Sequence, residues 1–307
     1  MKKTLLLVTL LLVIFLFLDL LFTSVYQKGD YSKEQWLMNL KGGTYDYGVL
    51  GSSRAYTTVD VKSINERTGL NGINLGIDGS LISTQALVFE VLLDADNKFD
   101  KIFFQIDSYN SNDEAIGKFT RPRFMPFIRQ PIVFDHFKKY GLEWYAYKYI
   151  PYLRYAEYNF DWGPHNFLNH LLEISNPDHD EAGSFFYPNP DFVGAKNTSE
   201  YLFDLDGEYA YLNRVVDLCK KNGIEIILFT APLASVAETE AHIENADAFK
   251  LICEDLKVPY YDFRTIYNED YSMFTNYNHL NRKGVSDFSA RLEKLIVKEQ
   301  NMLTANN

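Results

Sequence analysis

A serine and a histidine, far apart in the sequence, have the surroundings that acyl-transfer chemistry requires. Ser53 closes the segment VLGSS (49–53), in which a short apolar run stops at a glycine turn. A hydroxyl just past the end of a strand can act as a nucleophile, and backbone N–H groups in such a turn can stabilise an oxyanion. His279 lies in NYNHLN (276–281), directly before a predicted helix, where its imidazole could accept the serine proton.

Each of these segments also has a purely structural interpretation. Gly-Ser-Ser sequences are common in turns, and a serine at this position often only caps a helix. A third segment, NLGIDGS (74–80), places Gly76 and Gly79 where the backbone could approach a ligand, but it also suits an ordinary turn. Because all three segments follow predicted strands of one sheet, we favour the functional interpretation.

The segments that must position these residues alternate between strands and helices. Short apolar runs predict five strands, at 48–50, 73–75, 101–106, 224–230 and 258–263. Helical spacing of apolar residues predicts helices at 59–68, 84–93, 208–221, 237–256 and 282–298. This alternation indicates a three-layer α/β/α fold with a five-stranded parallel, flavodoxin-like sheet. Such sheets bind ligands at the carboxyl ends of their strands, where Ser53 and His279 are expected.

The segment 111–200 interrupts this alternation with many aromatic residues and prolines. Helical patches are predicted around 132–157 and 164–174, so we expect a mostly helical insertion. A long insertion in a compact α/β domain is often a lid or a binding element, although a helical cap with its own small core is an equal alternative. Trp144 and Trp162 are the rings that we expect to contact a substrate if the insertion forms a groove.

The N-terminus predicts a membrane anchor at residues 1–26. Two lysines precede an apolar run at 5–22, which as a helix spans about 27 Å and matches the core of a bilayer. The flank FTSVY (22–26) is a poor cleavage site, so an uncleaved anchor is favoured over a signal peptide. The lysines place the N-terminus in the cytoplasm and the rest of the chain outside.

The remainder of the chain is expected to be one domain on a short connector. Residues 27–44 are polar and contain glycines, which predicts a juxtamembrane connector, and 45–307 form the α/β domain with its insertion. Asp19 lies near the far end of the apolar run. We expect it to reach the membrane interface rather than to contact another membrane protein.

Composition excludes several classes of function. The net charge is −11 and no Lys/Arg cluster is present, so nucleic acid is not an expected partner. Cys219 and Cys253 fall in predicted helices and are interpreted as buried apolar residues rather than a disulfide. Neither CxxC nor HExxH spacing occurs, so neither a metal nor another cofactor is expected.

The three segments together resemble those of the SGNH/GDSL hydrolases, especially the membrane-anchored branch related to DltD and the alginate O-acetylation proteins AlgX and AlgJ. The resemblance covers about 47–110 and 205–298. GSS at 51–53 is similar to the family's Gly-Asp-Ser block, which implies that Ser53 is the nucleophile and its N–H an oxyanion donor.

The other two segments extend this resemblance. NLGIDG (74–79) looks like the family's second block, which implies that Gly79 is a further oxyanion donor. The segment NYNHLN is similar to the last block, which implies that His279 is the base. Its His-Leu-Asn-x-x-Gly ending is the most specific part of the match.

The sequence departs from the family pattern at two places. Asn276 stands where the family has the Asp that orients the histidine, and in a serine-protease triad this exchange lowers turnover about 10⁴-fold. The carbonyl oxygen of an Asn can nevertheless orient a histidine, and Asp78 is an alternative partner. The family's Gly-x-Asn-Asp block is missing after the third strand, where QIDSYN (105–110) leaves only Asn110 as a substitute donor. That absence is typical of the anchored branch.

The resemblance implies an extracytoplasmic O-acetyltransferase or acetylesterase that acts on a cell-envelope glycan, with Arg54 beside the nucleophile as a substrate contact. Because acetyl-CoA is not available outside the cell, a transferase would need a membrane-bound O-acyltransferase as its partner. The alternative is a non-catalytic binding or assembly module of an envelope polysaccharide acylation complex. Asn276 and the missing block favour this alternative.

Overall fold

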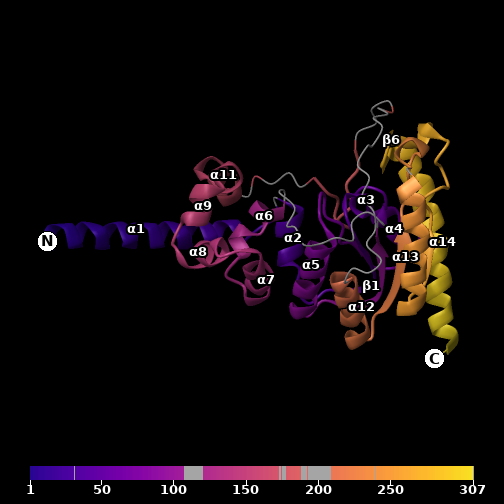
Figure 1. The fold of residues 1–307 in the computed structure, drawn as a ribbon, viewed down its shortest axis with the longest axis horizontal. Helices are drawn as coiled ribbons and strands as arrows, with labels where there is room; N and C mark the ends of the chain where they lie inside the picture. Colours follow the sequence, from indigo (N-terminus) through magenta and orange to yellow (C-terminus); the bar gives the residue numbers. More distant parts are fainter. Residues whose placement is uncertain are drawn as a thin grey trace.

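A long helix projects from one end of a body built on a β-sheet, and the two termini lie at opposite ends of the molecule (Figure 1). The computed structural model describes residues 1–30, 32–106, 120–172, 174, 178–187, 192, 209–238 and 240–306. The projecting helix is α1 (Lys2–Tyr26). Helices of the segment 120–172 surround the inner end of α1 (Figure 1).

The central sheet has five parallel strands in the order β2-β1-β3-β4-β5. They are β1 (Thr44–Leu50), β2 (Gly72–Asn74), β3 (Lys98–Gln105), β4 (Glu225–Thr230) and β5 (Tyr260–Asp262). This is the flavodoxin-like order, so the predicted fold class is confirmed. Val49 pairs with Asn74 and Leu50 pairs with Phe104, which brings the carboxyl ends of β1, β2 and β3 to one edge.

Helices cover both faces of the sheet, as the alternation of strands and helices predicts. One apolar cluster joins the sheet to α4 (Val61–Thr68) and α14 (Arg282–Asn306). The cluster on the opposite face includes α5 (Ile82–Asp94), α12 (Ala210–Asn222) and α13 (Glu240–Leu256). Because neighbouring side chains of a strand point to opposite faces, Val49 belongs to the first cluster and Leu50 to the second.

Six short α-helices and two 3₁₀ turns lie in residues 120–172, the longest described stretch of the insertion. They are α6 (Thr120–Arg123), η1 (Met125–Phe127), α7 (Pro131–Phe137), η2 (Lys138–Tyr140), α8 (Glu143–Tyr149), α9 (Leu153–Glu157), α10 (Asn159–Trp162) and α11 (Pro164–Leu171). Figure 1 shows α8, α9 and α11 around the inner end of α1. The residues predicted as a connector contain α2 (Lys33–Asn39), five of whose residues are buried.

The inner end of α1 is held in the insertion by a buried ion cluster. Asp19 is fully buried and lies 2.9 Å from Arg154 and 2.5 Å from Arg129. Arg154 is also fully buried and donates a hydrogen bond to Thr23, one turn further along α1. Two arginines of the insertion therefore neutralise Asp19 inside the protein, a pairing that the sequence did not indicate.

Candidate active site

The turn after β1 places Ser53 at the carboxyl edge of the sheet. Gly51 has a φ of 154°, and a Cβ at this position would lie 2.7 Å from the Cβ of Ala55 and 2.8 Å from that of Gln105, so the turn requires glycine. Ser52 caps the short helix α3 (Ser53–Tyr56), and both its N–H and its hydroxyl donate to the Gln105 side chain. Ser53 is thereby held as the first residue of α3.

The structure brings Ser53, His279 and Asn276 into one hydrogen-bonded chain. His279 and Asn276 lie on a small hairpin formed by β6 (Phe274–Asn276) and β7 (His279–Leu280). The Nε2 atom of His279 is 2.9 Å from Ser53 Oγ. Its Nδ1 atom is 3.1 Å from Asn276 Oδ1. Both ring nitrogens are thus engaged, so Asp78 is not the partner of His279.

The hairpin backbone determines which way the Asn276 amide faces. The backbone N–H groups of Asn278 and His279 donate to Asn276 Oδ1 at 3.1 and 3.0 Å. Because a backbone N–H can only donate, the atom that faces them must be the amide oxygen. That oxygen can accept but not donate, so Nδ1 of His279 carries the proton and Nε2 presents its lone pair to Ser53. This is the tautomer that a general base needs.

His279 is in its uncharged, basic form over a wide range of pH. Burial lowers the pKa of His279 to about 4, and the positive charge of Arg54 contributes to the shift. At neutral pH the imidazole is therefore free to accept a proton from Ser53. An imidazole without a carboxylate partner, however, gains less stabilisation once it becomes charged.

Two backbone N–H groups at this edge are available to an oxyanion. Among the described residues, neither Ser53 nor Gly79 donates its backbone N–H in a hydrogen bond. Gly79 has a φ of 62°, and its loop is tied to the serine turn because Ile77 N–H donates to the carbonyl of Gly51. Asn110, the further predicted donor, lies outside the described residues.

Two of the predicted substrate contacts lie inside the protein. Arg54 is 2% exposed, and its guanidinium donates to the carbonyls of Ala231 and Pro232. It therefore stabilises the loop after β4 and does not present its side chain to a ligand. Trp144 is fully buried and stacks on Phe137 within the insertion, which is the helical-cap alternative rather than a groove. The predictions that Arg54 and Trp144 contact a substrate were wrong, because the sequence alone does not show which side chains the folded protein buries.

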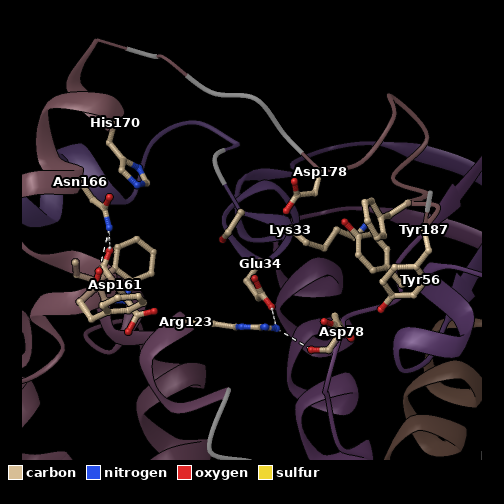
Figure 2. A pocket seen from close by; sticks show the side chains of 14 residues that line it. Lys33, Glu34, Tyr56, Asp78, Arg123, Asp161, Asn166, His170, Asp178 and Tyr187 are labelled. Atoms are coloured by element: carbon tan, nitrogen blue, oxygen red, sulfur yellow. Dashed lines mark hydrogen bonds and ion pairs between the residues drawn. The ribbon is translucent and has the colours of Figure 1, made fainter. Parts of the chain in front are cut away.

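Trp162, the third predicted contact, lines a pocket of about 490 Å³ between the insertion and the sheet domain. The opposite wall contains Tyr56, Asp78 and Tyr187 (Figure 2). The pocket is lined by Ser32, Lys33, Glu34, Tyr56, Asp78, Arg123, Phe160, Asp161, Trp162, Asn166, His170, Asp178, Phe185 and Tyr187. Five aromatic rings and four carboxylates in this set form a surface suited to a hydroxyl-rich ligand.

A row of aromatic rings joins this pocket to His279. Tyr56 stacks on Phe185 with their ring centroids 5.6 Å apart, and Phe185 packs against Tyr187. Tyr187 in turn lies 5.2 Å from the His279 ring. Ser53 and His279 do not line the pocket themselves. Tyr187 therefore both lines the pocket and contacts His279.

Charged side chains that the sequence analysis did not predict connect the segments around the pocket. Arg123 of α6 lies 2.6 Å from Glu34 of α2 and donates to the carbonyl of Asp78 at 2.7 Å (Figure 2). The buried Lys33 amine donates to the carbonyls of Asn74 and Gly183, and burial holds the pKa of Lys33 well below its usual value. Lys33 and Glu34 lie in the predicted connector and Arg123 in the predicted insertion, and no sequence pattern singled out any of the three.

The described residues contain no group of three or more His, Cys, Asp or Glu side chains that could hold a metal ion. Cys219 and Cys253 are buried free thiols, and burial raises the pKa of each to about 12.

Comparisons with known proteins give a distant structural likeness. No family model matches the chain, and no curated protein matches it either. A solved structure from Bacteroides fragilis NCTC 9343, described as a putative acylhydrolase, is 14% identical and has a TM-score of 0.40. The alignment covers 87% of this chain and 94% of that one. A likeness this distant assigns neither an activity nor a site residue to the present chain.

Proposed function

We propose that the chain is a membrane-anchored enzyme that transfers or hydrolyses acyl esters with Ser53 as its nucleophile. The observation that carries the proposal is the 2.9 Å contact between Ser53 Oγ and the unprotonated Nε2 of His279. A nucleophile within hydrogen-bond reach of a base that a third group orients is the signature of covalent acyl transfer.

The first half of the reaction forms an acyl-enzyme. The Ser53 proton passes to His279 Nε2 as Oγ attacks the ester carbonyl, and the N–H groups of Ser53 and Gly79 donate to the oxyanion. Asn276 Oδ1 holds the Nδ1 proton of the imidazolium throughout. When the tetrahedral intermediate collapses, the ester C–O bond breaks and His279 returns its proton to the leaving alcohol.

The second half transfers the acyl group to a hydroxyl. His279 takes the proton of a glycan hydroxyl or of a water molecule as the oxygen of that acceptor attacks the acyl carbonyl. The bond between the acyl carbon and Ser53 Oγ then breaks, and His279 returns the proton to Ser53 Oγ. The pocket beside Tyr187 supports a glycan acceptor, because aromatic faces stack on sugar rings and carboxylates accept hydroxyl protons. An esterase that removes acetyl groups from such a glycan would use the same steps with water as acceptor.

The packing of α1 supports an uncleaved anchor over a signal peptide. Among the described residues, α1 is the one helix that is long and apolar enough to cross a membrane. Cleavage near its inner end would remove Asp19, which is fully buried in the insertion and paired with Arg154. It would also remove Phe22 and Tyr26, which belong to the hydrophobic core. With Lys2 and Lys3 in the cytoplasm, the catalytic domain lies outside the cell.

A transferase in this location requires a membrane partner as its source of acyl groups. An acyl carrier such as acetyl-CoA is confined to the cytoplasm, so the acyl group must cross the membrane on another protein. A membrane-bound O-acyltransferase beside α1 is the partner that we propose.

A non-catalytic binding or assembly module is the second candidate function. The neutral Asn276 favours it, because no carboxylate stabilises the imidazolium that catalysis forms. Under this alternative the aromatic pocket recognises the glycan, and the Ser53–His279 contact is only structural.

Substitution of Ser53 separates the two candidates. We expect Ser53→Ala and His279→Ala each to lower the hydrolysis of 4-nitrophenyl acetate at least about 10³-fold, because the residues act as a unit. Matched controls are Ser63→Ala on α4 and His165→Ala on α11, which lie outside the hydrogen-bonded chain and should retain activity. Labelling by a fluorophosphonate should require both Ser53 and His279. Turnover by Ser53→Ala equal to that of the unmodified chain would refute the enzymatic proposal.

A further inference from the structure

The turn between α8 and α9 presents uncovered apolar side chains beside α1. Tyr149 and Ile150 are 65% and 51% exposed. Tyr152, at the end of this turn, stacks on Phe15 with ring centroids 6.2 Å apart, and its N–H donates to Asp19 at 3.0 Å. Phe15 belongs to the exposed apolar part of α1. Tyr152 also contacts the ring of Phe22, with ring centroids 5.1 Å apart. The turn therefore lies alongside α1 between Phe15 and Phe22.

The exposed part of α1 is too short to cross a bilayer without help from the insertion. Residues 2–17 are all exposed, and beyond them the insertion begins to bury the helix. At about 1.5 Å per residue these residues span about 24 Å, whereas the hydrocarbon core is about 30 Å thick. An anchor that spans this core must draw the nearest part of the insertion towards the lipid.

We propose that the insertion docks on the lipid bilayer around α1, with Tyr149 and Ile150 at the membrane interface. This inference rests on the proposed membrane anchor. Tyrosine is enriched at the boundary between lipid and water, where its ring meets apolar chains and its hydroxyl stays hydrated. The charge of Asp19 does not oppose this depth, because Arg129 and Arg154 neutralise it within the protein.

The docked insertion also determines where the pocket opens. Trp162, Asn166 and His170 of α10 and α11 line the pocket, and α11 packs against α1 through the stacked rings of Phe167 and Phe22. With the insertion at the membrane surface, the pocket and the neighbouring Ser53 lie close to the bilayer. A ligand or partner protein in the membrane can then reach them without leaving its surface.

Fluorescent probes on single cysteines test this surface. Full-length Tyr149→Cys, Ile150→Cys, Leu12→Cys and Leu251→Cys variants are labelled with the dye NBD and placed in phosphatidylcholine/phosphatidylglycerol nanodiscs with or without doxyl-labelled lipid. Leu12 lies in the exposed part of α1, whereas Leu251 is a 63% exposed residue of α13 at the other end of the molecule (Figure 1). The native thiols of Cys219 and Cys253 are buried and stay unlabelled.

We expect the doxyl lipid to quench probes at positions 149, 150 and 12 at least about twofold more than the probe at 251. Quenching at 149 and 150 equal to that at 251, with position 12 strongly quenched, would overturn the docking and leave the anchor intact. A probe at position 12 that is not quenched would overturn the anchor itself, and the docking with it.

A second measurement uses the unmodified chain. A photoactivatable phospholipid in the same nanodiscs should form adducts with peptides that cover 142–152 and not with those that cover 240–256. Adducts distributed equally between the two segments would also overturn the docking.

Discussion

At the scale of single residues, Asn276 orients His279 without carrying a charge. Its amide cannot turn over, because two backbone N–H groups hold the oxygen in place. The loss of activity that an Asp-to-Asn exchange causes through the wrong tautomer is therefore avoided. What remains missing is the negative charge, which would raise the pKa of His279 and stabilise its charged form.

The pH dependence of turnover should report this arrangement. Protonated His279 cannot accept the Ser53 proton, so kcat/KM should be lost as pH falls through the pKa of His279, which is about 4. Asn276→Asp adds a carboxylate at Nδ1 and should move this acid limb to higher pH. Profiles of kcat/KM for 4-nitrophenyl acetate between about pH 3.5 and 8 measure both effects.

A matched control for this prediction is Asn278→Asp. It adds the same charge to the hairpin without a contact to His279 Nδ1, so the acid limb should move less than in Asn276→Asp. Two results would contradict the assigned geometry. One is a loss of kcat/KM in the unmodified chain near the pKa of an ordinary histidine. The other is an Asn276→Asp profile whose acid limb lies at the same pH as that of the unmodified chain.

At the scale of elements, the ion cluster on α1 couples this apolar helix to the insertion. Asp19 and Arg154 are both fully buried, so removal of one charge leaves the other unpaired. We expect Asp19→Asn to lower the free energy of unfolding by about 3–5 kcal/mol. Chemical unfolding of the full chain in detergent micelles, followed by circular dichroism, measures this change.

An exposed ion pair provides the control. Arg67 of α4 and Glu293 of α14 are joined at 2.5 Å on the surface, so Glu293→Gln should cost no more than about 1 kcal/mol. A loss in Asp19→Asn no larger than this would show that Asp19 does not hold α1 in the insertion.

At the scale of the whole molecule, charge should select the ligand of the pocket. The chain carries a net charge of −11, and four carboxylates line the pocket beside Arg123 and Lys33. Because Glu34 pairs with Arg123 and burial disfavours the charged form of Lys33, the lining repels anions. We expect neutral or amino-sugar oligosaccharides to bind more tightly than uronic-acid oligosaccharides of equal length.

Titration calorimetry at low and high salt tests this selectivity. The difference between the two classes of oligosaccharide should shrink as salt screens the carboxylates. Tighter binding of the uronic-acid oligosaccharides would show that Arg123, and not the carboxylates, dominates recognition.

The sequence by itself determined the sheet, the ends of several helices and the two principal residues of the site. Helix α4 ends at Thr68 as predicted, and α12 ends at Asn222, one residue beyond its predicted end. Each helix stops there because the next residue, Gly69 or Gly223, adopts the left-handed conformation that ends a helix. Ser53 and His279 could be paired in advance because the loops after parallel strands open on the same edge of the sheet.

Only the tertiary structure decided how these residues are surrounded. The contacts of Arg54 with Ala231 and Pro232, the pairing of Asp19 with Arg154 and the contact of Tyr187 with His279 all join segments far apart in the chain. Local spacing carries no information about such contacts, because they depend on how the insertion packs against α1 and the sheet. The orientation of the Asn276 amide likewise required the hairpin backbone, whose N–H groups hold its oxygen towards His279.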